Sequence, residues 1–453
     1  MDLIKLLQRE FDSKNLVIDS RNLVPYSVDE SEAGPFFPQA ALIAESPLEI
    51  ENLLKLALEF NFPVTPRGLG SGKSGGSLPC EGGVVLALDK MQRILEIDEQ
   101  SLLAIVEPGV ITGNLHRAVE GEGLFYPPDP ASLDECTIGG NVSENAGGPR
   151  AFHYGVTSHF VLGMEVVTMG GTRFNIGQKS VKGVSGLNLT GLLTGSEGTL
   201  GVFSRIMLKL LPKPADPGII MVFFRDVHQA GTALTNILTS SLFPMSMELL
   251  DQTSLRNIQG VEGFTSPADA GGALICEFEG LGTNKDLKNR ALAKFKESNP
   301  LHLQIALSKQ ECDQVWAARR NVSTKLKENH KHKISEDIAL PRIVLPHALK
   351  LIDKIARENG LLKGCYGHAG DGNLHVNFLS DQPDPELAFS KAVQELFSTV
   401  IALGGTLSGE HGIGLSKKQY MPIEHDPNEL AVMKAIKKAW DPWNLLNPGK
   451  IFP

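Results

Sequence analysis

Three glycine-rich stretches within the first 210 residues place the strongest constraint on how this chain can fold. They are residues 68–76, 137–148 and 194–201. The second holds four glycines, two asparagines and two hydroxyl side chains in twelve positions. Such segments expose many backbone N–H groups, and glycine lets the backbone come close to a ligand. We therefore expect these stretches to hold one long ligand that carries phosphates and a flat polar ring.

The first stretch matches two well-known nucleotide-binding patterns only in part. Residues 70–75 satisfy G-x-G-x-x-G, but residues 75–79, Gly-Gly-Ser-Leu-Pro, prevent the helix that this fingerprint requires. Residues 68–74 resemble a Walker A loop with one residue too few between its glycines. What remains is a strand, residues 62–65, that leads into a turn rich in backbone donors. On this segment alone, a pyrophosphate site and a flexible surface loop both stay open.

Composition excludes several classes of protein. The chain has 453 residues and a formal net charge of −9, which does not suit a nucleic-acid-binding surface. No run approaches the roughly 18 apolar residues of a transmembrane helix. The N-terminal 15 residues carry the acidic Asp2, Glu10 and Asp12, lack an apolar stretch that ends in small residues, and resemble neither a secretory nor a transit peptide. We expect a cytoplasmic protein, and peripheral attachment at the inner membrane stays open.

A proline-rich segment, residues 212–217, has the composition of a domain boundary. Before it, short apolar runs predict strands, including a hairpin around Gly170-Gly171. After it, predicted strands alternate with predicted helices, which indicates a sheet on one side and helices on the other. The predicted strands are 218–224, 246–250, 273–278, 301–306, 362–367 and 373–379, and the predicted helices are 227–240, 283–297, 308–328 and 384–402.

A polar cluster in the second half of the chain predicts a metal site. His375 and Asn377 lie two apart on a predicted strand and so share a face, and a glycine turn can fold His368 back towards His375. Two imidazoles brought together suit a metal with nitrogen and oxygen ligands. Glu410 is then a natural third ligand, which leaves His411 for proton transfer. A lone histidine is more often structural, but the shared glycine-rich setting favours the metal site.

Four segments give the chain a family resemblance. They are VTPRGLGS at 64–71, EPGV at 107–110, GGNVSENAGG at 139–148 and GSEGTLGV at 195–202. The chain resembles the vanillyl-alcohol oxidase and p-cresol methylhydroxylase superfamily. Within that superfamily, the resemblance is closest to the D-lactate dehydrogenase, D-2-hydroxyglutarate dehydrogenase and glycolate oxidase D-subunit group, over the whole chain.

The resemblance implies an α+β fold of two domains. Residues 1–214 would form a two-part FAD-binding domain of the p-cresol methylhydroxylase type. Residues 215–453 would form a ferredoxin-like α+β substrate (cap) domain with C-terminal helices, in which about 404–453 return to the flavin.

The resemblance also implies where FAD is held. Residues 66–72 would cradle the pyrophosphate, 137–148 would contact the flavin and its ribityl arm, and 195–202 would contact the rest. Some relatives attach FAD to a histidine in the first stretch; this chain has Ser71 and Lys73 there, so we expect non-covalent FAD. The cofactor-binding residues expected on this basis are Pro66, Arg67, Gly68, Leu69, Gly70, Ser71, Gly72, Thr137, Gly139, Gly140, Asn141, Ser143, Asn145, Gly147, Glu197, Gly201, Val202 and Asn447.

Relatives in this group hold a divalent metal, often zinc, with residues that match His368, His375 and Glu410. In the same comparison His411 matches the catalytic base and a substrate contact, and Asn377 matches a further substrate contact.

The expected substrate-binding residues also include two on a predicted helix. Arg319 and Ser323 lie four apart, and arginine offers a planar fork that matches a carboxylate. Relatives that use a dicarboxylate have a lysine shortly before the Asp-x-x-x-Pro strand. Here Lys333 precedes Asp337 by four residues rather than two, which leaves recognition of a second carboxylate open.

Together these features predict FAD-dependent oxidation of an (R)-2-hydroxy acid to the 2-oxo acid. The substrate would be D-lactate, glycolate or D-2-hydroxyglutarate; the metal would acidify its hydroxyl, His411 would take the proton, and C2 would pass a hydride to the flavin. Two alternatives stay open: a sugar or alcohol oxidase of the same superfamily that uses oxygen, and a flavin-binding subunit without turnover of its own. A homodimer is also open.

The five cysteines bear on how the electrons leave. They lie at least 36 residues apart, so the chain has no CxxC pair and no iron–sulfur run of its own. We therefore expect a separate electron acceptor, such as an electron-transfer flavoprotein, a quinone or an iron–sulfur partner.

Overall fold

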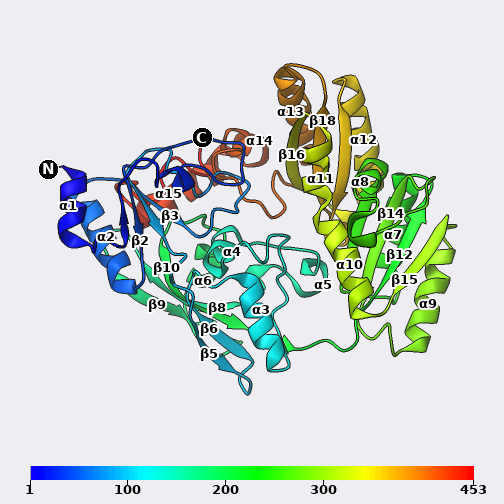
Figure 1. Ribbon diagram of the computed structural model, residues 1–453, viewed down its shortest axis with the longest axis horizontal. Helices are drawn as coiled ribbons and strands as arrows, with labels where there is room; N and C mark the ends of the chain where they lie inside the picture. Colours follow the sequence, from blue (N-terminus) through cyan, green and yellow to red (C-terminus); the bar gives the residue numbers. More distant parts are fainter. Residues whose placement is uncertain (1) are drawn as a thin grey trace. The chain divides into compact units, whose positions relative to one another are not determined.

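The computed structural model describes residues 2–453, which form two compact units (Figure 1). The first unit contains the chain up to Gly147, residues 156–213 and residues 410–453; the second contains residues 148–155 and 214–409. The chain therefore passes between the units four times. Among the described residues, no helix has both the length and the apolar character needed to cross a membrane.

A four-stranded sheet forms one part of the first unit. Its strand order is β1 (Leu16–Val17), β2 (Ala40–Ile43), β4 (Val84–Ala87) and β3 (Val64–Arg67). Strands β2, β4 and β3 run parallel, as expected for buried apolar runs, and their inner residues pack with α1 (Leu3–Glu10) and α2 (Pro47–Phe60). The C-terminal Leu445 and Leu446 complete this core, and the Val64 amide donates to the Leu445 carbonyl at 2.8 Å.

A five-stranded antiparallel sheet forms the other part of this unit. Its order is β5 (Ile94–Asp98), β6 (Leu103–Val106), β10 (Val202–Lys209), β8 (Val161–Val167) and β9 (Arg173–Gly177), and β7 (Leu124–Phe125) pairs separately with β11 (Leu211–Pro212). The predicted hairpin around Gly170-Gly171 is confirmed as β8 and β9. The remaining helices of this unit are α3 (Thr112–Gly121), α4 (Ile138–Glu144), α6 (Leu189–Leu193), α14 (Met421–Glu424) and α15 (Pro427–Trp440).

The second glycine-rich stretch is not a continuous loop, as the sequence suggested. Helix α4 occupies most of it, although its sequence contains two glycines, which are poor helix formers. The Thr137 side chain caps the helix by accepting a hydrogen bond from the Gly140 amide at 3.2 Å. Ile138 and Val142 are fully buried. The cap and this burial offset the cost of the glycines.

The second unit is built on one seven-stranded antiparallel sheet. Its order is β15 (His302–Ala306), β12 (Gly218–Phe224), β14 (Gly272–Phe278), β13 (Ser246–Asp251), β17 (Leu362–Gly367), β18 (Asn373–Ser380) and β16 (His332–Ala339). Its helices are α5 (Ala151–Tyr154), α7 (Val227–Leu238), α8 (Gln252–Asn257), α9 (Lys285–Lys296), α10 (Lys309–Arg320), α11 (Val322–Asn329), α12 (Leu345–Glu358) and α13 (Glu386–Ala402).

Helices cover both faces of this sheet, so the expectation of helices on one side only is wrong (Figure 1). Helices α8, α10 and α11 pack on one face and share a core with β12–β15 and β17. Helices α7 and α12 contact the sheet separately from that core. Every residue of β12 and of β14 is buried, as expected for strands covered on both faces. The uninterrupted apolar run at 218–224 was the sequence signal for this arrangement.

A buried lysine joins three segments of the first unit. The Nζ of Lys437, on α15, donates to the Thr199 and Leu446 carbonyls, each at 2.8 Å, and to the Asp441 carboxylate at 2.6 Å. Lys437 therefore connects the third glycine-rich stretch to the C-terminal segment that completes the core.

We expect Lys437→Met to destabilise the first unit by about 3 kcal/mol, because removing one partner leaves the Asp441 charge buried and uncompensated. Urea unfolding followed by circular dichroism measures this loss. Lys438→Met is the matched control, since Lys438 is exposed on the same helix. Equal unfolding midpoints for the two variants would contradict the role assigned to Lys437.

Candidate functional site

The three glycine-rich stretches line one pocket in the first unit. Glu410 and His411, from the C-terminal stretch of the same unit, line this pocket as well. The expected cofactor-binding residues that line it are Pro66, Arg67, Gly68, Leu69, Gly70, Ser71, Gly72, Thr137, Gly139, Gly140, Asn141, Ser143, Glu197, Gly201 and Val202.

Three further residues of that set lie behind the pocket lining. The side-chain amide of Asn447 donates to the backbone carbonyl of Glu197 at 2.7 Å. Asn145 ends α4 in the left-handed conformation. A Cβ on Gly147 would stand 2.9 Å from Glu410 Oε2, so glycine allows the C-terminal stretch to approach. These residues support the wall.

The first glycine-rich stretch wraps around the side chain of Arg67. The guanidinium is buried and donates to the Pro25 carbonyl at 3.0 Å and to Ser77 Oγ at 3.2 Å. Gly70 has φ +75°, and a Cβ there would collide with the guanidinium. The shape of this wall therefore requires glycine at position 70.

Two buried carboxyl groups stand together beside the pocket. Glu197 accepts hydrogen bonds from the Ile413 and Gly414 amides at 2.8 and 2.7 Å, and a Cβ on Gly412 would touch both Glu197 and Glu144. Burial and the neighbouring Glu197 raise the pKa of Glu144 well above its usual value. Burial also raises the pKa of Glu197, and the two amides partly offset this.

The pocket suits a long polar ligand. No heavy atom lies within 4 Å of the position that a Cβ on Gly72 would take, so the backbone there is open to a ligand. Among the described residues, Glu144 Oε2 is a buried acceptor without a hydrogen-bond partner. A cofactor with phosphates and a polar ring would satisfy these groups.

In the second unit, strand register gathers a buried polar cluster on the sheet. Asp337 on β16 lies opposite His375 on β18, which lies opposite Tyr366 on β17. His368 follows directly after β17, and its ring centre is 5.5 Å from that of His375, with the rings nearly perpendicular. The predicted approach of the two histidines is confirmed. Both are buried, with exposed fractions of 4% and 7%.

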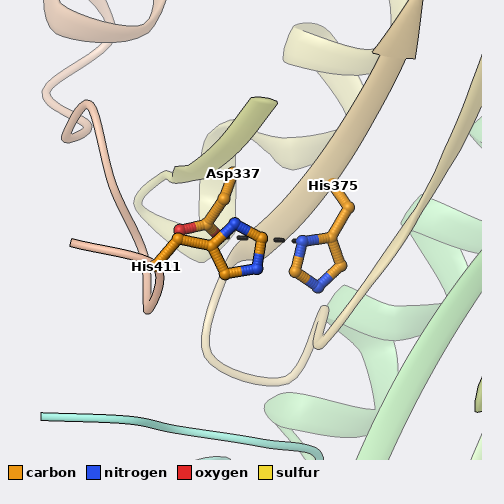
Figure 2. A group of neighbouring side chains, drawn as sticks. All are labelled: Asp337, His375 and His411. Carbon is orange, nitrogen blue, oxygen red and sulfur yellow. Dashed lines mark ion pairs between the residues drawn. The ribbon is translucent and has the colours of Figure 1, made fainter. Parts of the chain in front are cut away.

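A carboxylate holds each of these histidines. Glu248 Oε1 lies 2.7 Å from Nδ1 of His368, and Asp337 Oδ1 forms an ion pair at 3.8 Å with Nδ1 of His375. Figure 2 shows this second pair with its dashed line; His411, also labelled there, belongs to the first unit. In both histidines the carboxylate faces Nδ1, so Nε2 is the nitrogen on the opposite side of the ring. Metal-binding histidines usually donate their other ring N–H to a partner such as a carboxylate, and His368 has that partner within hydrogen-bond distance.

Glu248 also binds an arginine. Its Oε2 accepts from Arg319 Nε at 2.6 Å, and the guanidinium lies over the Tyr366 ring at 4.7 Å. Burial would raise the pKa of Glu248, but Arg319 and His368 lower it to about 2. Glu248 is therefore a charged group in the interior of the sheet.

Asp337 connects this cluster to the end of the second unit. Its Oδ2 accepts from the Gly409 amide at 2.8 Å and from Ser408 Oγ at 3.0 Å. Gly409 is the last residue of the second unit, and Glu410 is the next residue in the chain.

The expected substrate-binding residues of the second unit surround the same cluster. Arg319 and Ser323 do not share one helix, because α10 ends at Arg320 and α11 begins at Val322. Ser323 Oγ accepts from Lys333 Nζ at 2.7 Å. Asn377 Oδ1 is buried and, within the described part of the chain, has no hydrogen-bond partner.

The sequence analysis missed Glu144 and Glu248. A signal for Glu248 was present, since it is an acidic residue inside the otherwise apolar Met247-Glu-Leu-Leu250. Charged residues on buried strands are rare unless they are paired. The partners could not be read from the sequence, because they lie on other strands and helices.

Comparisons with known proteins agree with these observations. Residues 213–451 match the C-terminal domain of FAD-linked oxidases, and residues 38–177 match an FAD-binding domain. The chain is 38% identical to glycolate oxidase subunit GlcD of Bacillus subtilis (strain 168) over 94% of this chain and 92% of that protein. It is 30% identical to D-2-hydroxyglutarate dehydrogenase of Stutzerimonas stutzeri (strain A1501), over 99% and 98%.

The fold is also found among solved structures. Substrate-bound p-cresol methylhydroxylase superposes with a TM-score of 0.80 at 18% identity, covering 99% of this chain and 96% of that one. The resemblance drawn from the sequence and the fold class that it implied are confirmed.

We expect Gly70→Ala to weaken FAD binding about tenfold. A left-handed alanine costs roughly 1–2 kcal/mol, and 1.4 kcal/mol corresponds to tenfold in affinity. The free loop can relax to avoid this strain, but the cofactor needs the original shape. Titration of the apoprotein with FAD, followed by flavin fluorescence, measures the effect.

Gly82→Ala is the matched control, because Gly82 has φ +71°, meets nothing within 4 Å and does not line the pocket. Unchanged FAD affinity in Gly70→Ala would contradict the assignment of this loop.

Proposed function

The chain belongs to the FAD-linked oxidase family, and from this premise we propose that it oxidises a small (R)-2-hydroxy acid to the 2-oxo acid with non-covalently bound FAD. The observation that carries the proposal is the position of His411, which lines the same pocket as the three glycine-rich stretches. A proton acceptor at a flavin pocket suits the oxidation of an alcohol carbon, since the hydroxyl must lose its proton as the carbon loses a hydride.

Each residue of the pocket has a role in this proposal. FAD, when bound, supplies the acceptor for the hydride. The backbone of residues 66–72 and 137–140 binds the cofactor, and Asn447 holds the wall behind it. His411 takes the proton from the substrate hydroxyl.

A divalent metal, with zinc as the first candidate, fits the chemistry of the donor set. His368 and His375 are buried imidazoles, and each has a carboxylate at Nδ1. Glu410 is the proposed third ligand, and it directly follows Gly409, whose amide is bonded to Asp337. The metal, when bound, would lower the pKa of the substrate hydroxyl.

The substrate carboxylate has donors in the same cluster. Glu248 accepts from Nε of Arg319 and forms an ion pair with Nη2, and the remaining N–H groups of the guanidinium can donate to a carboxylate. Asn377 and Ser323 are the further proposed contacts. Two of the relatives carry the names glycolate oxidase subunit and D-2-hydroxyglutarate dehydrogenase, so glycolate, D-lactate and D-2-hydroxyglutarate are the candidates.

The electrons would leave through a separate acceptor. All five cysteines are free thiols, and four of them are buried. Isolated thiols do not hold an iron–sulfur cluster, which needs four ligands together. The proposed acceptor is an electron-transfer flavoprotein, a quinone or an iron–sulfur partner. Anaerobic flavin reduction by a panel of R and S 2-hydroxy acids tests the activity, and oxygen uptake distinguishes an oxidase.

We expect His411→Ala to bind FAD normally but to slow anaerobic flavin reduction by about 10²–10⁴-fold, the usual contribution of a general base. Stopped-flow absorbance with D-lactate, glycolate and D-2-hydroxyglutarate measures it. His425→Ala is the control, because His425 pairs with Glu429 and does not line the pocket. Its flavin should be reduced at the wild-type rate. Near wild-type reduction in His411→Ala would exclude His411 as the base.

Metal removal provides an independent test. Dialysis against a chelator should lower the rate of flavin reduction at least about 100-fold, in keeping with the large charge stabilisation that metals supply. Zinc, manganese or cobalt should restore the rate, and the FAD content should not change. Full activity in protein shown by elemental analysis to be metal-free would remove the metal from the proposal.

A further inference from the structure

We propose that Glu248 is a positioning residue that sets the orientation of His368 for a metal and of Arg319 for the substrate carboxylate. The inference rests on the proposed function, since it assigns partners to two residues of that site. Glu248 itself touches neither group; it acts through the two side chains that it holds.

The contacts of Glu248 divide cleanly between its two oxygens. Oε1 lies 2.7 Å from Nδ1 of His368, and Oε2 accepts from Nε of Arg319 at 2.6 Å and forms an ion pair with Nη2 at 2.5 Å. Its side chain has no exposed surface. One carboxylate therefore fixes two side chains, and water does not compete for it.

The sheet makes this arrangement rigid. Strand β13 pairs with β14 on one side and with β17 on the other. Leu249 lies opposite Gly367, so the next antiparallel pair brings position 248 opposite His368. Sites built on strands are held more precisely than sites built on loops.

The consequence for His368 is a defined ring nitrogen. A carboxylate at Nδ1 favours a proton on that nitrogen, and this leaves the lone pair of the neutral ring on Nε2. Metal-binding histidines usually have such a partner, and its loss typically costs 10–100-fold in metal affinity. Glu248 fixes the orientation of Arg319 in the same way, because it binds one edge of the planar guanidinium while the guanidinium lies over the Tyr366 ring.

A buried acid–arginine pair can also be purely structural, and the chain offers a matched example. Glu277, on the adjacent strand β14, is 2% exposed and binds Arg150 Nε at 3.2 Å and Trp316 Nε1 at 3.3 Å. Among the described residues, its two side-chain hydrogen bonds are to an arginine and a tryptophan, whereas those of Glu248 are to an arginine and a histidine. Glu248 and Glu277 therefore differ in the one feature that the proposal uses.

The experiment compares Glu248→Gln with Glu277→Gln in the full-length holoprotein. Glutamine keeps the shape but removes the charge, and its amide cannot accept from both His368 and Arg319. Zinc affinity is measured by competition with a chromogenic chelator, alongside FAD content and the urea midpoint. We expect Glu248→Gln to bind zinc 10–100-fold more weakly, while Glu277→Gln binds it as the wild type does. Where the wild type turns over, Glu248→Gln should also raise KM for the hydroxy acid.

Several results would overturn the proposal. One is a zinc affinity in Glu248→Gln equal to that of the wild type. Another is an equal loss of zinc affinity in Glu277→Gln. A third is a wild-type protein that binds no zinc, manganese or cobalt. Failure of the proposed function is seen separately: if no 2-hydroxy acid reduces the flavin of the wild type, the activity is wrong, while a selective loss of zinc affinity in Glu248→Gln still supports the positioning role of Glu248.

Discussion

The buried carboxylate of Glu197 holds the C-terminal stretch in the first unit, and the pocket depends on it. Two consecutive amides, from Ile413 and Gly414, donate to its two oxygens. Hydrogen bonds carry more weight where water is excluded, as it is around this buried side chain. Glu410 and His411 precede these amides by only a few residues. The Leu415 and Ser416 amides also donate to the Ser74 carbonyl, at 2.8 and 3.1 Å, so Glu197 and Ser74 together hold the segment that carries the proposed base.

The second unit uses carboxylates in a related way, but on a sheet rather than at a loop. Glu248 and Asp337 come from different strands, and each faces Nδ1 of one histidine. The two rings are nearly perpendicular; His375 lies within β18, and His368 lies just beyond β17. An acid therefore stands beside an imidazole twice around one polar cluster, at 2.7 Å for His368 and at 3.8 Å for His375.

Local features were predictable from the sequence, whereas long-range pairing was not. Strand β12 begins and ends where its apolar run predicted, because burial and β-branched or aromatic content act over a few residues, and the bounds of β17 were also predicted. The return of His368 towards His375 was also predictable, since a short glycine turn joins them. Glu248 and His368 are 120 positions apart, and only the β13–β17 register brings them together. Helix α4 was not predicted, because its glycines disfavour a helix and the burial that offsets their cost is not visible in the local sequence.

The first unit is built from three separate segments of the chain, and this has a consequence for how the chain folds during synthesis. Strand β3 binds residues near position 445. The backbone amide of Val64 donates to the Leu445 carbonyl, and the backbone amide of Asn447 donates to the Val64 carbonyl. Residues 214–409 leave the ribosome before these partners do. The second unit can therefore fold while the first still lacks part of its core, which reverses the usual N-to-C order of domain folding. Until the last residues emerge, the nascent cofactor-binding unit exposes an incomplete sheet edge, and chaperones would have most to protect there.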